Sequence, residues 1–448
     1  MSDDAATNET VELLQTMIRN RCVNDGTPTS GNEARNVDVL AAVLEGSGLD
    51  IERYTAAPGR DSLVVRIQGT DPRAPSLALM GHTDVVPVDE AAWARDPFGG
   101  ELVDGEVWGR GAVDMLNLTA SMAVAFRRLA DDDRFRPKGD LVFVAVADEE
   151  SGSAHGLRWL ADHARDAMSA DYVLTENGGL HAGSADEPLI TCNVAEKGVA
   201  WRRLRIHGRP GHGSMPFRSD NALVKAAAVV TRIADYRPEP RFHELWRSRV
   251  ETLPFDDETR AALLDPARID EVLLDMPNVG SAAYLHACTH TTLSSNVLTG
   301  TSKTNVIPGH VEIDVDVRTL PGEDDAAVRA HLVEAIGAEL AAEVDIETIL
   351  DDPASISSTS TPLWDSLQRS VARPFPSARL LPSLSVGFTD ARIYRELGAV
   401  AYGAGLLSPD LDSGAFSQRF HGNDERIDVD SLRLTTQLWL DVARDFHR

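Results

Sequence analysis

Residues 141–152 read Leu-Val-Phe-Val-Ala-Val-Ala-Asp-Glu-Glu-Ser-Gly. The uninterrupted apolar run at 141–147 predicts a parallel strand that is buried on both faces. It ends at Asp148, Glu149 and Glu150, whose adjacent charges repel one another and require a counter-charge. Since consecutive side chains diverge, we expect one glutamate to hold a metal and the other to handle a proton. A solvated acidic turn is the alternative, and the buried strand before it weighs against that interpretation.

Two other apolar segments end in the same way. Residues 76–80 lead into Gly81-His82-Thr83-Asp84, where the period of two in a strand points His82 and Asp84 in one direction. Asp84 could therefore orient the His82 ring through its second nitrogen, or orient another ligand across the site. Taken alone, this tripeptide also fits a strand end with an aspartate in a turn. Residues 171–178 repeat the design, with Glu176 after an apolar strand.

Asp114 and His421 complete the set of candidate metal-binding residues. Asp114 follows the glycine-rich segment 108–113 and precedes a predicted helix at 116–129, so it fits either a helix cap or a carboxylate that bridges two cations. His421 stands just before the predicted last helix, 429–446. Together the candidates supply two imidazoles, three further carboxylates suited to ligation, and one carboxylate free to move protons. This is the donor set of a two-metal hydrolase.

The chain resembles the M20 family of dinuclear zinc peptidases and amidohydrolases, which includes carboxypeptidases, aminoacylases, acetylornithine deacetylases and succinyl-diaminopimelate desuccinylases. The resemblance is ordered along nearly the whole chain. It rests on the motifs at 81–87, 109–115, 148–152, 175–177, 211–216, 305–309 and 421–425.

The resemblance implies that Asp114 bridges two Zn²⁺ ions, with Co²⁺ or Mn²⁺ as substitutes. His82 and Glu176 would complete one site, and Glu150 with His421 the other. Three ligand carboxylates would leave net positive charge on the ion pair, which favours a bridging hydroxide.

The same resemblance assigns Glu149 as the general base and acid, and Asp84 as the residue that orients His82. It also implies a cis peptide between Asp114 and Met115. Many members continue with Lys-Gly after the methionine, whereas this chain has Leu116-Asn117. That departure touches none of the predicted ligands and concerns only their surroundings.

The candidate substrate-binding residues are His212, Asn305, Arg318 and Thr389. By resemblance, His212 in the loop Pro-Gly-His-Gly-Ser-Met-Pro reaches the active site of a partner subunit and stabilises an oxyanion. Asn305 is expected to contact the substrate, and Thr389 belongs to a loop that resembles the one beside the metal site. Arg318 could bind a substrate carboxylate, although a solvated strand arginine fits equally well.

The predicted fold is an α/β class, a zinc-exopeptidase-like α/β/α sandwich with an inserted α+β (ferredoxin-like) domain. Residues 1–196 and 357–448 are expected to form the two parts of the catalytic domain, and the resemblance implies that residues 197–356 are the lid or dimerisation domain. Within the insert, the strict alternation at 311–318 predicts a sheet with one buried face, covered by helices at 221–236 and 324–342. The additional stretch 237–289 is predicted to be mostly helical.

The amino-acid composition of the chain narrows the classes of function and the cellular location that we expect. A net charge of −27 excludes a nucleic-acid binder, and no apolar run is long enough to cross a membrane. The acidic start of the chain lacks an apolar signal core, and three widely separated cysteines fit reduced thiols, so we expect a cytoplasmic protein. The shortage of lysine fits either a salt-adapted host or a GC-rich genome.

We therefore expect a homodimeric hydrolase that cleaves an amide or peptide bond of a small peptide or an N-acyl amino acid. A biosynthetic N-succinyl or N-acetyl amino acid deacylase is the alternative. A serine hydrolase is excluded because Gly213-Ser214 is followed by Met215-Pro216 and forms no nucleophile elbow. A non-catalytic binding protein on the same fold would have lost Glu149 or a ligand, and this chain retains all of them.

Overall fold

The protein is described by a computed structural model covering residues 3–184, 187–300 and 303–448. It divides into two compact units. The first comprises the described residues up to Val194 together with Ser357–Ser383 and Thr389–Arg448. The second comprises Ala195–Ile356 and Leu384–Phe388. The sequence-based boundaries lie at 196/197 and 356/357, and they place Leu384–Phe388 in the first domain instead of the second unit.

The first unit is built on a mixed sheet with the strand order β1-β2-β6-β3-β7-β18-β9. Neighbours among β6, β3, β7 and β18 are parallel, whereas β1, β2 and β9 pair antiparallel. β8 and β17 also pair with β9. The bounds are β1 Ile51–Ala57, β2 Arg60–Ile67, β3 Leu77–His82, β6 Leu141–Val146, β7 Tyr172–Thr175, β8 His181–Gly183, β9 Pro188–Glu196, β17 Arg379–Ser385 and β18 Val400–Gly403.

Strand β6 is buried at every position, as its unbroken apolar sequence predicts. Phe143 points to one face and meets Phe126 of helix α3, with ring centroids 5.9 Å apart. Val142 and Val144 point to the other face and join the core beneath α4, α5 and α14. The sheet is therefore covered on both sides.

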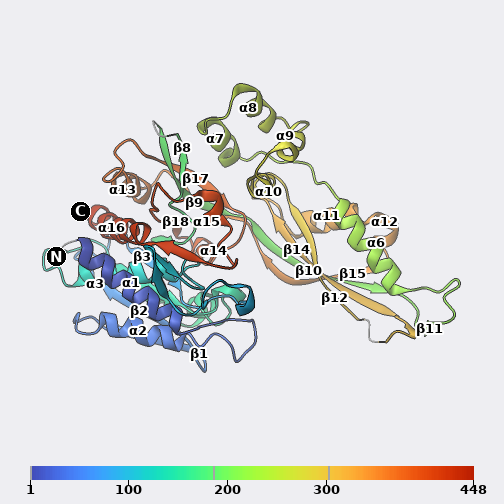
Figure 1. Cartoon of the computed structure of the whole chain (residues 1–448), viewed down its shortest axis with the longest axis horizontal. Helices are drawn as coiled ribbons and strands as arrows, with labels where there is room; N and C mark the ends of the chain where they lie inside the picture. Colours follow the sequence, from blue (N-terminus) through green and yellow to red (C-terminus); the bar gives the residue numbers. More distant parts are fainter. Residues whose placement is uncertain (1–2, 185–186, 301–302) are drawn as a thin grey trace. The chain divides into compact units, whose positions relative to one another are not determined.

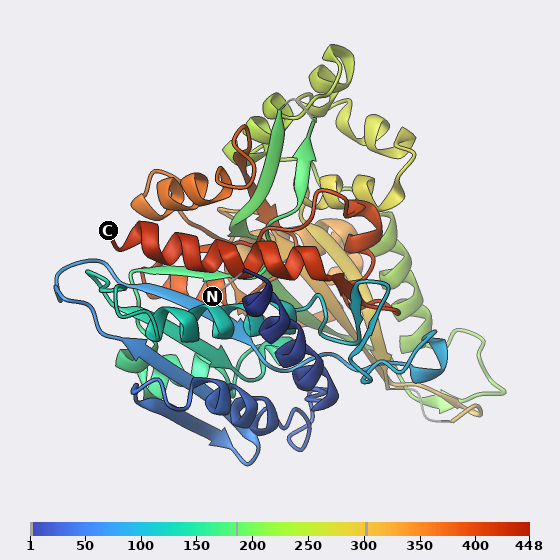
Figure 2. The same ribbon diagram turned by 60° about the vertical axis from the view of Figure 1, so that its left-hand side comes forward.

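The helices of the first unit form the two outer layers of this sandwich. Helices α1, α3 and α16 pack against one another, and both views show the C-terminal α16 beside α1 (Figures 1 and 2). The bounds are α1 Asp3–Arg19, α2 Ala34–Leu44, α3 Leu116–Ala130, α4 Leu157–His163, α5 Arg165–Met168, α13 Pro362–Val371, α14 Ala391–Glu396, α15 Ser413–Ser417 and α16 Val429–Phe446. A small separate sheet has the order β19-β5-β4, with β4 Glu101–Val103, β5 Glu106–Trp108 and β19 Arg426–Asp428.

The second unit is an antiparallel sheet of order β12-β14-β10-β15. Its chain order β10-α6-β12-β14-α11-β15 is that of a ferredoxin-like fold. Alternate residues of β14 are buried, and they form one core with α6 and α11. The bounds are β10 Gly198–His207, α6 Ala222–Asp235, β12 Thr292–Thr299, β14 His310–Thr319, α11 Asp325–Ile336, α12 Ala338–Ala341 and β15 Val344–Asp352.

Two additions extend this second unit. The short strands β11 (Gly211–His212) and β13 (Val306–Ile307) pair with each other. Between α6 and β12 the chain forms α7 (Glu244–Thr252), α8 (Asp257–Leu263), α9 (Ile269–Asp275) and α10 (Val279–Ala287), as the sequence predicts. Strand β16 (Ser355–Ile356) pairs with the end of β9, where the chain leaves this unit. In the described ranges, no helix combines the length and apolar character that crossing a bilayer requires.

Candidate metal centre

Three of the predicted site segments meet at one edge of the first unit's sheet. His82 is the last residue of β3, Glu149 and Glu150 follow β6, and Glu176 follows β7. Strand β3 lies between β6 and β7 and is parallel to both. Since the carboxyl ends of parallel neighbours lie at the same edge, residues that are far apart in sequence are brought together. All three segments reach this edge as buried strands.

Asp114 lies between the two histidines. One of its carboxylate oxygens is 3.3 Å from His82 Nε2, and the other is 3.2 Å from His421 Nε2. The residue that precedes α3 as its cap is Met115, so the helix-cap interpretation of Asp114 is wrong. The peptide bond between Asp114 and Met115 is cis, as the family resemblance implies.

The predicted ligands form two groups that share Asp114. His82, Asp114 and Glu176 form one, and Asp114, Glu150 and His421 form the other; within each group one donor atom per residue lies within 4.8 Å of the others. His421 Nε2 is also 3.3 Å from Glu150 Oε2. Around a tetrahedral ion with bonds of 2.0–2.1 Å, donor atoms are about 3.3 Å apart. The residues therefore fit a pair of divalent cations bridged by one carboxylate.

The tautomer of His82 suits this arrangement. Its Nδ1 lies 3.0 Å from the carbonyl oxygen of Asp84 and 3.4 Å from a carboxylate oxygen of the same residue. Both neighbours are acceptors, so Nδ1 carries a hydrogen, and Nε2, which faces Asp114, is the ring nitrogen that could bind a cation.

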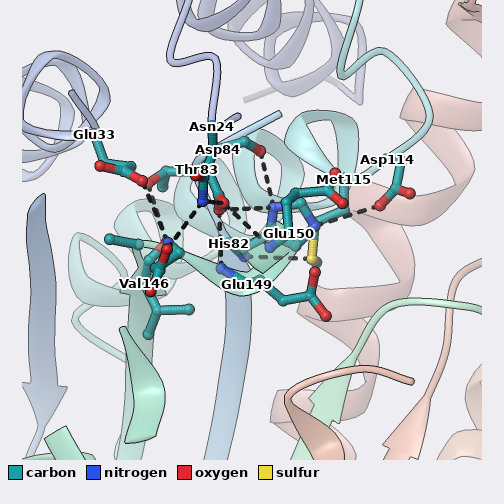
Figure 3. Close-up of polar contacts among 12 residues, drawn as sticks. Asn24, Glu33, His82, Thr83, Asp84, Asp114, Met115, Val146, Glu149 and Glu150 are labelled. Carbon is teal, nitrogen blue, oxygen red and sulfur yellow. Dashed lines mark hydrogen bonds and ion pairs between the residues drawn. The ribbon is translucent and has the colours of Figure 1, made fainter. Parts of the chain in front are cut away.

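Glu149 belongs to neither ligand group. It is buried and begins the short 3₁₀ turn Glu149–Ser151, which follows Asp148 in the left-handed conformation (φ 66°). This turn separates the two glutamate side chains, while the Glu149 and Glu150 amides both donate to the Asp84 carboxylate at 3.3 and 3.2 Å. Figure 3 shows the two glutamates beside His82 and Asp84. Glu149 thus lies beside the candidate metal ligands but belongs to neither of their two groups.

The electrostatics of the protein atoms favour added positive charge. Burial raises the pKa of Glu149 and of Glu176 well above the ordinary value of 4.5, and neighbouring carboxylates raise both further. Hydrogen bonds to Asp114 and Glu150 raise the pKa of His421 to about 10. So many acids in one buried place are stable only with protons or cations between them.

A buried polar layer behind the site was not predicted from the sequence. The Asn24 amide donates to Asp84 Oδ2 at 2.8 Å and to Asp148 Oδ1 at 3.0 Å, and the guanidinium of Arg60 donates to Asp148 Oδ1 at 2.7 Å (Figure 3 includes Asn24). Arg60 also donates to Glu33 at 2.8 Å. Asn24 therefore fixes Asp148, which precedes the Glu149–Ser151 turn, and Asp84, which accepts from the amides of that turn. No motif marks it, since its role depends on a contact across 60 residues of chain.

Glu425 is a second residue whose role was missed, although the motif 421–425 includes it. Its fully buried carboxylate accepts from the amides of Gly111, Val113 and Asp114 at 3.1, 2.6 and 3.1 Å. The guanidinium of Arg110 donates to it at 2.7 Å. Glu425 thus ties the Asp114 loop to the segment that carries His421, so it holds two candidate ligands in place.

The predicted substrate residues are divided between the two units. His212 and Asn305 are exposed and near each other in the second unit, where the Gly213 amide donates to the Asn305 carbonyl at 2.9 Å. The His212 ring contacts the Ser214 hydroxyl at 2.8 Å. Thr389 belongs to the first unit and is buried, with its hydroxyl accepting from the Ala391 amide at 3.1 Å.

Arg318 is held at the polar face of β14. Its Nε donates to Asp316 at 2.7 Å, and its guanidinium lies 5.2 Å from the centre of the Phe388 ring. Nη1 is buried without a hydrogen-bond partner among the described residues. A fully solvated strand arginine would have neither feature, because its guanidinium would be hydrated.

The sandwich and the candidate metal ligands at its strand ends are features of a metal-dependent hydrolase. The chain belongs to peptidase family M20/M25/M40, whose model matches residues 78–445. A succinyl-diaminopimelate desuccinylase of Cereibacter sphaeroides is 28% identical over 430 residues, which is 94% of this chain and 95% of the relative. A probable carboxypeptidase S-like 2 of Dictyostelium discoideum is 25% identical over 86% of this chain and 74% of its own length.

A solved structure gives the same fold. The M20 family metallo-carboxypeptidase Sso-CP2 from Sulfolobus solfataricus matches with a TM-score of 0.73 and 17% identity, over 98% of this chain and 99% of that one. The predicted fold class and the family resemblance are confirmed.

Proposed function

We propose that this protein is a dinuclear zinc hydrolase that cleaves an amide or peptide bond in a small peptide or an N-acyl amino acid. One observation carries the proposal: the two oxygens of Asp114 face two different histidines, each of which has its own carboxylate neighbour. The family membership gives the reaction class, hydrolysis of a carbon–nitrogen bond by a metal-dependent enzyme.

The donor set fits two Zn²⁺ ions, held by His82, Asp114 and Glu176 and by Asp114, Glu150 and His421. Imidazole with carboxylate is a ligand combination that zinc accepts, and Co²⁺ or Mn²⁺ are substitutes. When bound, such ions acidify water and polarise the carbonyl group of a substrate.

The chain's own contribution to the chemistry is proton transfer and orientation. Glu149 is buried, and its carboxylate accepts the proton of the attacking water and returns it to the nitrogen of the leaving amine. Burial raises the pKa of Glu149, which makes its carboxylate a stronger base than an exposed one. Asp84 keeps the proton of His82 on Nδ1, so that the lone pair of Nε2 is available to bind a metal ion.

Arg318 is the candidate for recognition of a substrate carboxylate. Asp316 and Phe388 fix its guanidinium, and the unpartnered Nη1 leaves donor capacity for a ligand. Asn305 and His212, which the pairing of β11 with β13 brings close together, are proposed to contact the substrate amide, and Thr389 is proposed as a further substrate-binding residue. The alternative substrates remain peptides and N-acyl amino acids, in line with relatives named as a carboxypeptidase and a desuccinylase.

We further propose a homodimer formed through the second unit, in which it acts as the lid and dimerisation domain. Strand β12 is at the edge of its sheet and exposes Val297 and Leu298, a surface suited to pairing with a second copy. A cytoplasmic location is supported by three buried cysteines that form no disulfide with one another.

The test is a substrate screen with metal-reconstituted protein. Dipeptides, N-acetyl amino acids and N-succinyl amino acids are compared by kcat/KM after loading with Zn²⁺, Co²⁺ or Mn²⁺. The Glu149→Gln protein, purified in parallel, measures hydrolysis by contaminants. We expect one substrate class to exceed the others by at least about tenfold, which is about 1.4 kcal/mol of transition-state discrimination. Rates equal to those of the Glu149→Gln protein for every class would refute the proposed function.

A further inference from the structure

A second cluster of metal-binding residues lies in the helical segment of the second unit, within residues that the proposed reaction does not use. It consists of Asp270 in the first turn of α9, His286 in the last turn of α10, and His290 just beyond that helix. One donor atom from each lies within 4.8 Å of the others. His286 and His290 have the i, i+4 spacing that places two side chains on one side of a helical turn.

His290 has the features of a ligand whose tautomer is fixed in advance. Its ring is fully buried, and Nδ1 lies 3.0 Å from the carbonyl oxygen of His286. The Thr289 hydroxyl donates to the carbonyl oxygens of Leu285 and His286, so toward His290 Nδ1, 3.0 Å away, it is an acceptor. The ring hydrogen is therefore on Nδ1, and the lone pair of Nε2 points into the cluster.

The contact between His290 and Asp270 lacks a hydrogen bond. His290 Nε2 is 3.3 Å from Asp270 Oδ1, yet both buried atoms are without a hydrogen-bond partner in the part of the chain that the structure describes. A bare nitrogen lone pair facing a carboxylate oxygen is unfavourable unless a positive centre lies between them. The 3.3 Å separation equals the spacing of about 3.3 Å between two ligands of a tetrahedral zinc ion.

His286 requires one adjustment. Its ring is stacked on that of His290, with centroids 4.0 Å apart and an angle of 4° between the planes. Lone pairs in two parallel planes cannot meet at one ion, so His286 must rotate about its side-chain bonds. It is half-buried, whereas His290 is fixed by its own bonds and by Lys197, whose amine donates to the His290 carbonyl at 2.7 Å. The histidine that has to reorient is thus the less buried of the two.

We propose that Asp270, His286 and His290 bind a third divalent transition-metal ion, preferably Zn²⁺, that ties α9 to the end of α10. Two imidazoles and one carboxylate are a donor set that zinc accepts, and the Asp270 side chain, 47% exposed, leaves a fourth position open to water. The ion has a structural purpose here. Helices α7 to α10 contain only seven to nine residues each, too few to be stable alone, and a metal joining two of them stabilises the segment.

The experiment counts metal ions on the full-length protein. Wild type, Asp270→Asn and His286→Ala are dialysed to equilibrium against buffered Zn²⁺, and bound zinc is measured by atomic emission. We expect each variant to hold one ion fewer than wild type, with unchanged amide hydrolysis. His207→Ala is the matched control, because His207 pairs with Asp345 at the surface of the same unit and should lose no ion.

Loading with Co²⁺ provides a second readout. The visible absorption of the third ion should disappear in Asp270→Asn and His286→Ala and persist in His207→Ala. Circular dichroism verifies that each variant is folded, and Asp270→Asn preserves the shape of the side chain should His286→Ala fail to fold. Equal zinc content in wild type and Asp270→Asn, or an equal loss in His207→Ala, would overturn the proposal. Failure of the catalytic centre would instead lower the zinc content of all proteins alike and leave this difference intact.

Discussion

Asp84 holds His82 through both its backbone and its side chain: His82 Nδ1 is 3.0 Å from the Asp84 carbonyl oxygen and 3.4 Å from its carboxylate. The same carboxylate accepts from the Glu149 and Glu150 amides and from the Asn24 side chain. One aspartate thus sets the orientation of a ligand on β3 and of the turn after β6. Loss of its charge should disturb both.

Asp84→Asn is expected to lower zinc affinity and kcat/KM by about 10–100-fold, the usual cost of removing a partner of a metal ligand. The effect should be smaller than that of removing a ligand, because the backbone carbonyl still holds Nδ1. Zinc titration and steady-state kinetics measure it. Asp38→Asn, which alters an exposed ion pair with Arg53, is the control. Wild-type affinity in Asp84→Asn would contradict the proposed orientation.

Glu149→Gln should retain its zinc and lose turnover. Glu149 belongs to neither group of candidate metal ligands, so the number of bound metal ions per subunit should stay at the wild-type value. Since an amide cannot accept the proton of water, kcat should fall by at least about 10²–10⁴-fold. Rapid turnover with full metal content would remove Glu149 from its proposed role.

Glu425→Gln should weaken metal binding without touching a ligand. Four N–H groups donate to the Glu425 carboxylate. In Glu425→Gln the side-chain NH₂ group would face at least one of these N–H groups, and two donors cannot form a hydrogen bond with each other. The unmade hydrogen bonds cost about 1–3 kcal/mol each when buried. We expect a lower Tm and weaker zinc affinity. Glu106→Gln, on the neighbouring strand β5, should change the metal affinity little.

Glu323 provides a test of acid stability in the second unit. Burial would raise its pKa, but hydrogen bonds from His331, Thr291 and the Leu320 amide lower it to about 2. Because the folded-state pKa is below the ordinary 4.5, the stabilisation is complete above about pH 4.5 and is lost as the pH falls toward 2.

The corresponding experiment follows the free energy of unfolding of metal-free protein against pH. Glu323→Gln should be less stable than wild type by about 1–3 kcal/mol at neutral pH, with the difference narrowing below pH 4.5. Glu334→Gln is the control, because Glu334 is an exposed carboxylate that accepts from Tyr236, whose hydroxyl also contacts His331. A difference independent of pH would show that the charge of Glu323 has no part in stability.

Subunit mixing tests whether His212 acts on a partner's site. Equal amounts of inactive His212→Ala and inactive Glu149→Gln subunits should regain about a quarter of wild-type activity, because half of the dimers are mixed and each has one complete site. Exchange is verified with differently tagged subunits. Confirmed exchange without recovered activity would place His212 in the site of its own chain.

The strand ends are the part of the site that the sequence predicts well. An apolar run buried on both faces implies a parallel strand, and parallel neighbours bring acids at their carboxyl ends together, as happens for His82, Glu150 and Glu176. The last helix is predicted at its observed bounds, 429–446, because its start coincides with a capping aspartate.

Other features depend on contacts that no local pattern encodes. Helix α1 begins at Asp3, although its first turns are polar and carry little of the apolar periodicity that predicts a helix. Asn24 and Glu425 acquire their roles only from partners 60 or more residues away. Leu384–Phe388 joins the second unit although its neighbours belong to the first, and Phe388 reaches Arg318 through a ring contact.

The chain leaves and re-enters the first unit at almost the same point. The Ser357 amide donates to the Val194 carbonyl at 2.8 Å, and Ser355 and Ile356 pair with Glu196 and Ala195. The codons for 195–356 therefore form one continuous insert, and the strands that end at or just before His82, Glu150 and Glu176 lie outside it. Insertions and deletions within that segment can therefore accumulate in the gene without interrupting strands β3, β6 and β7.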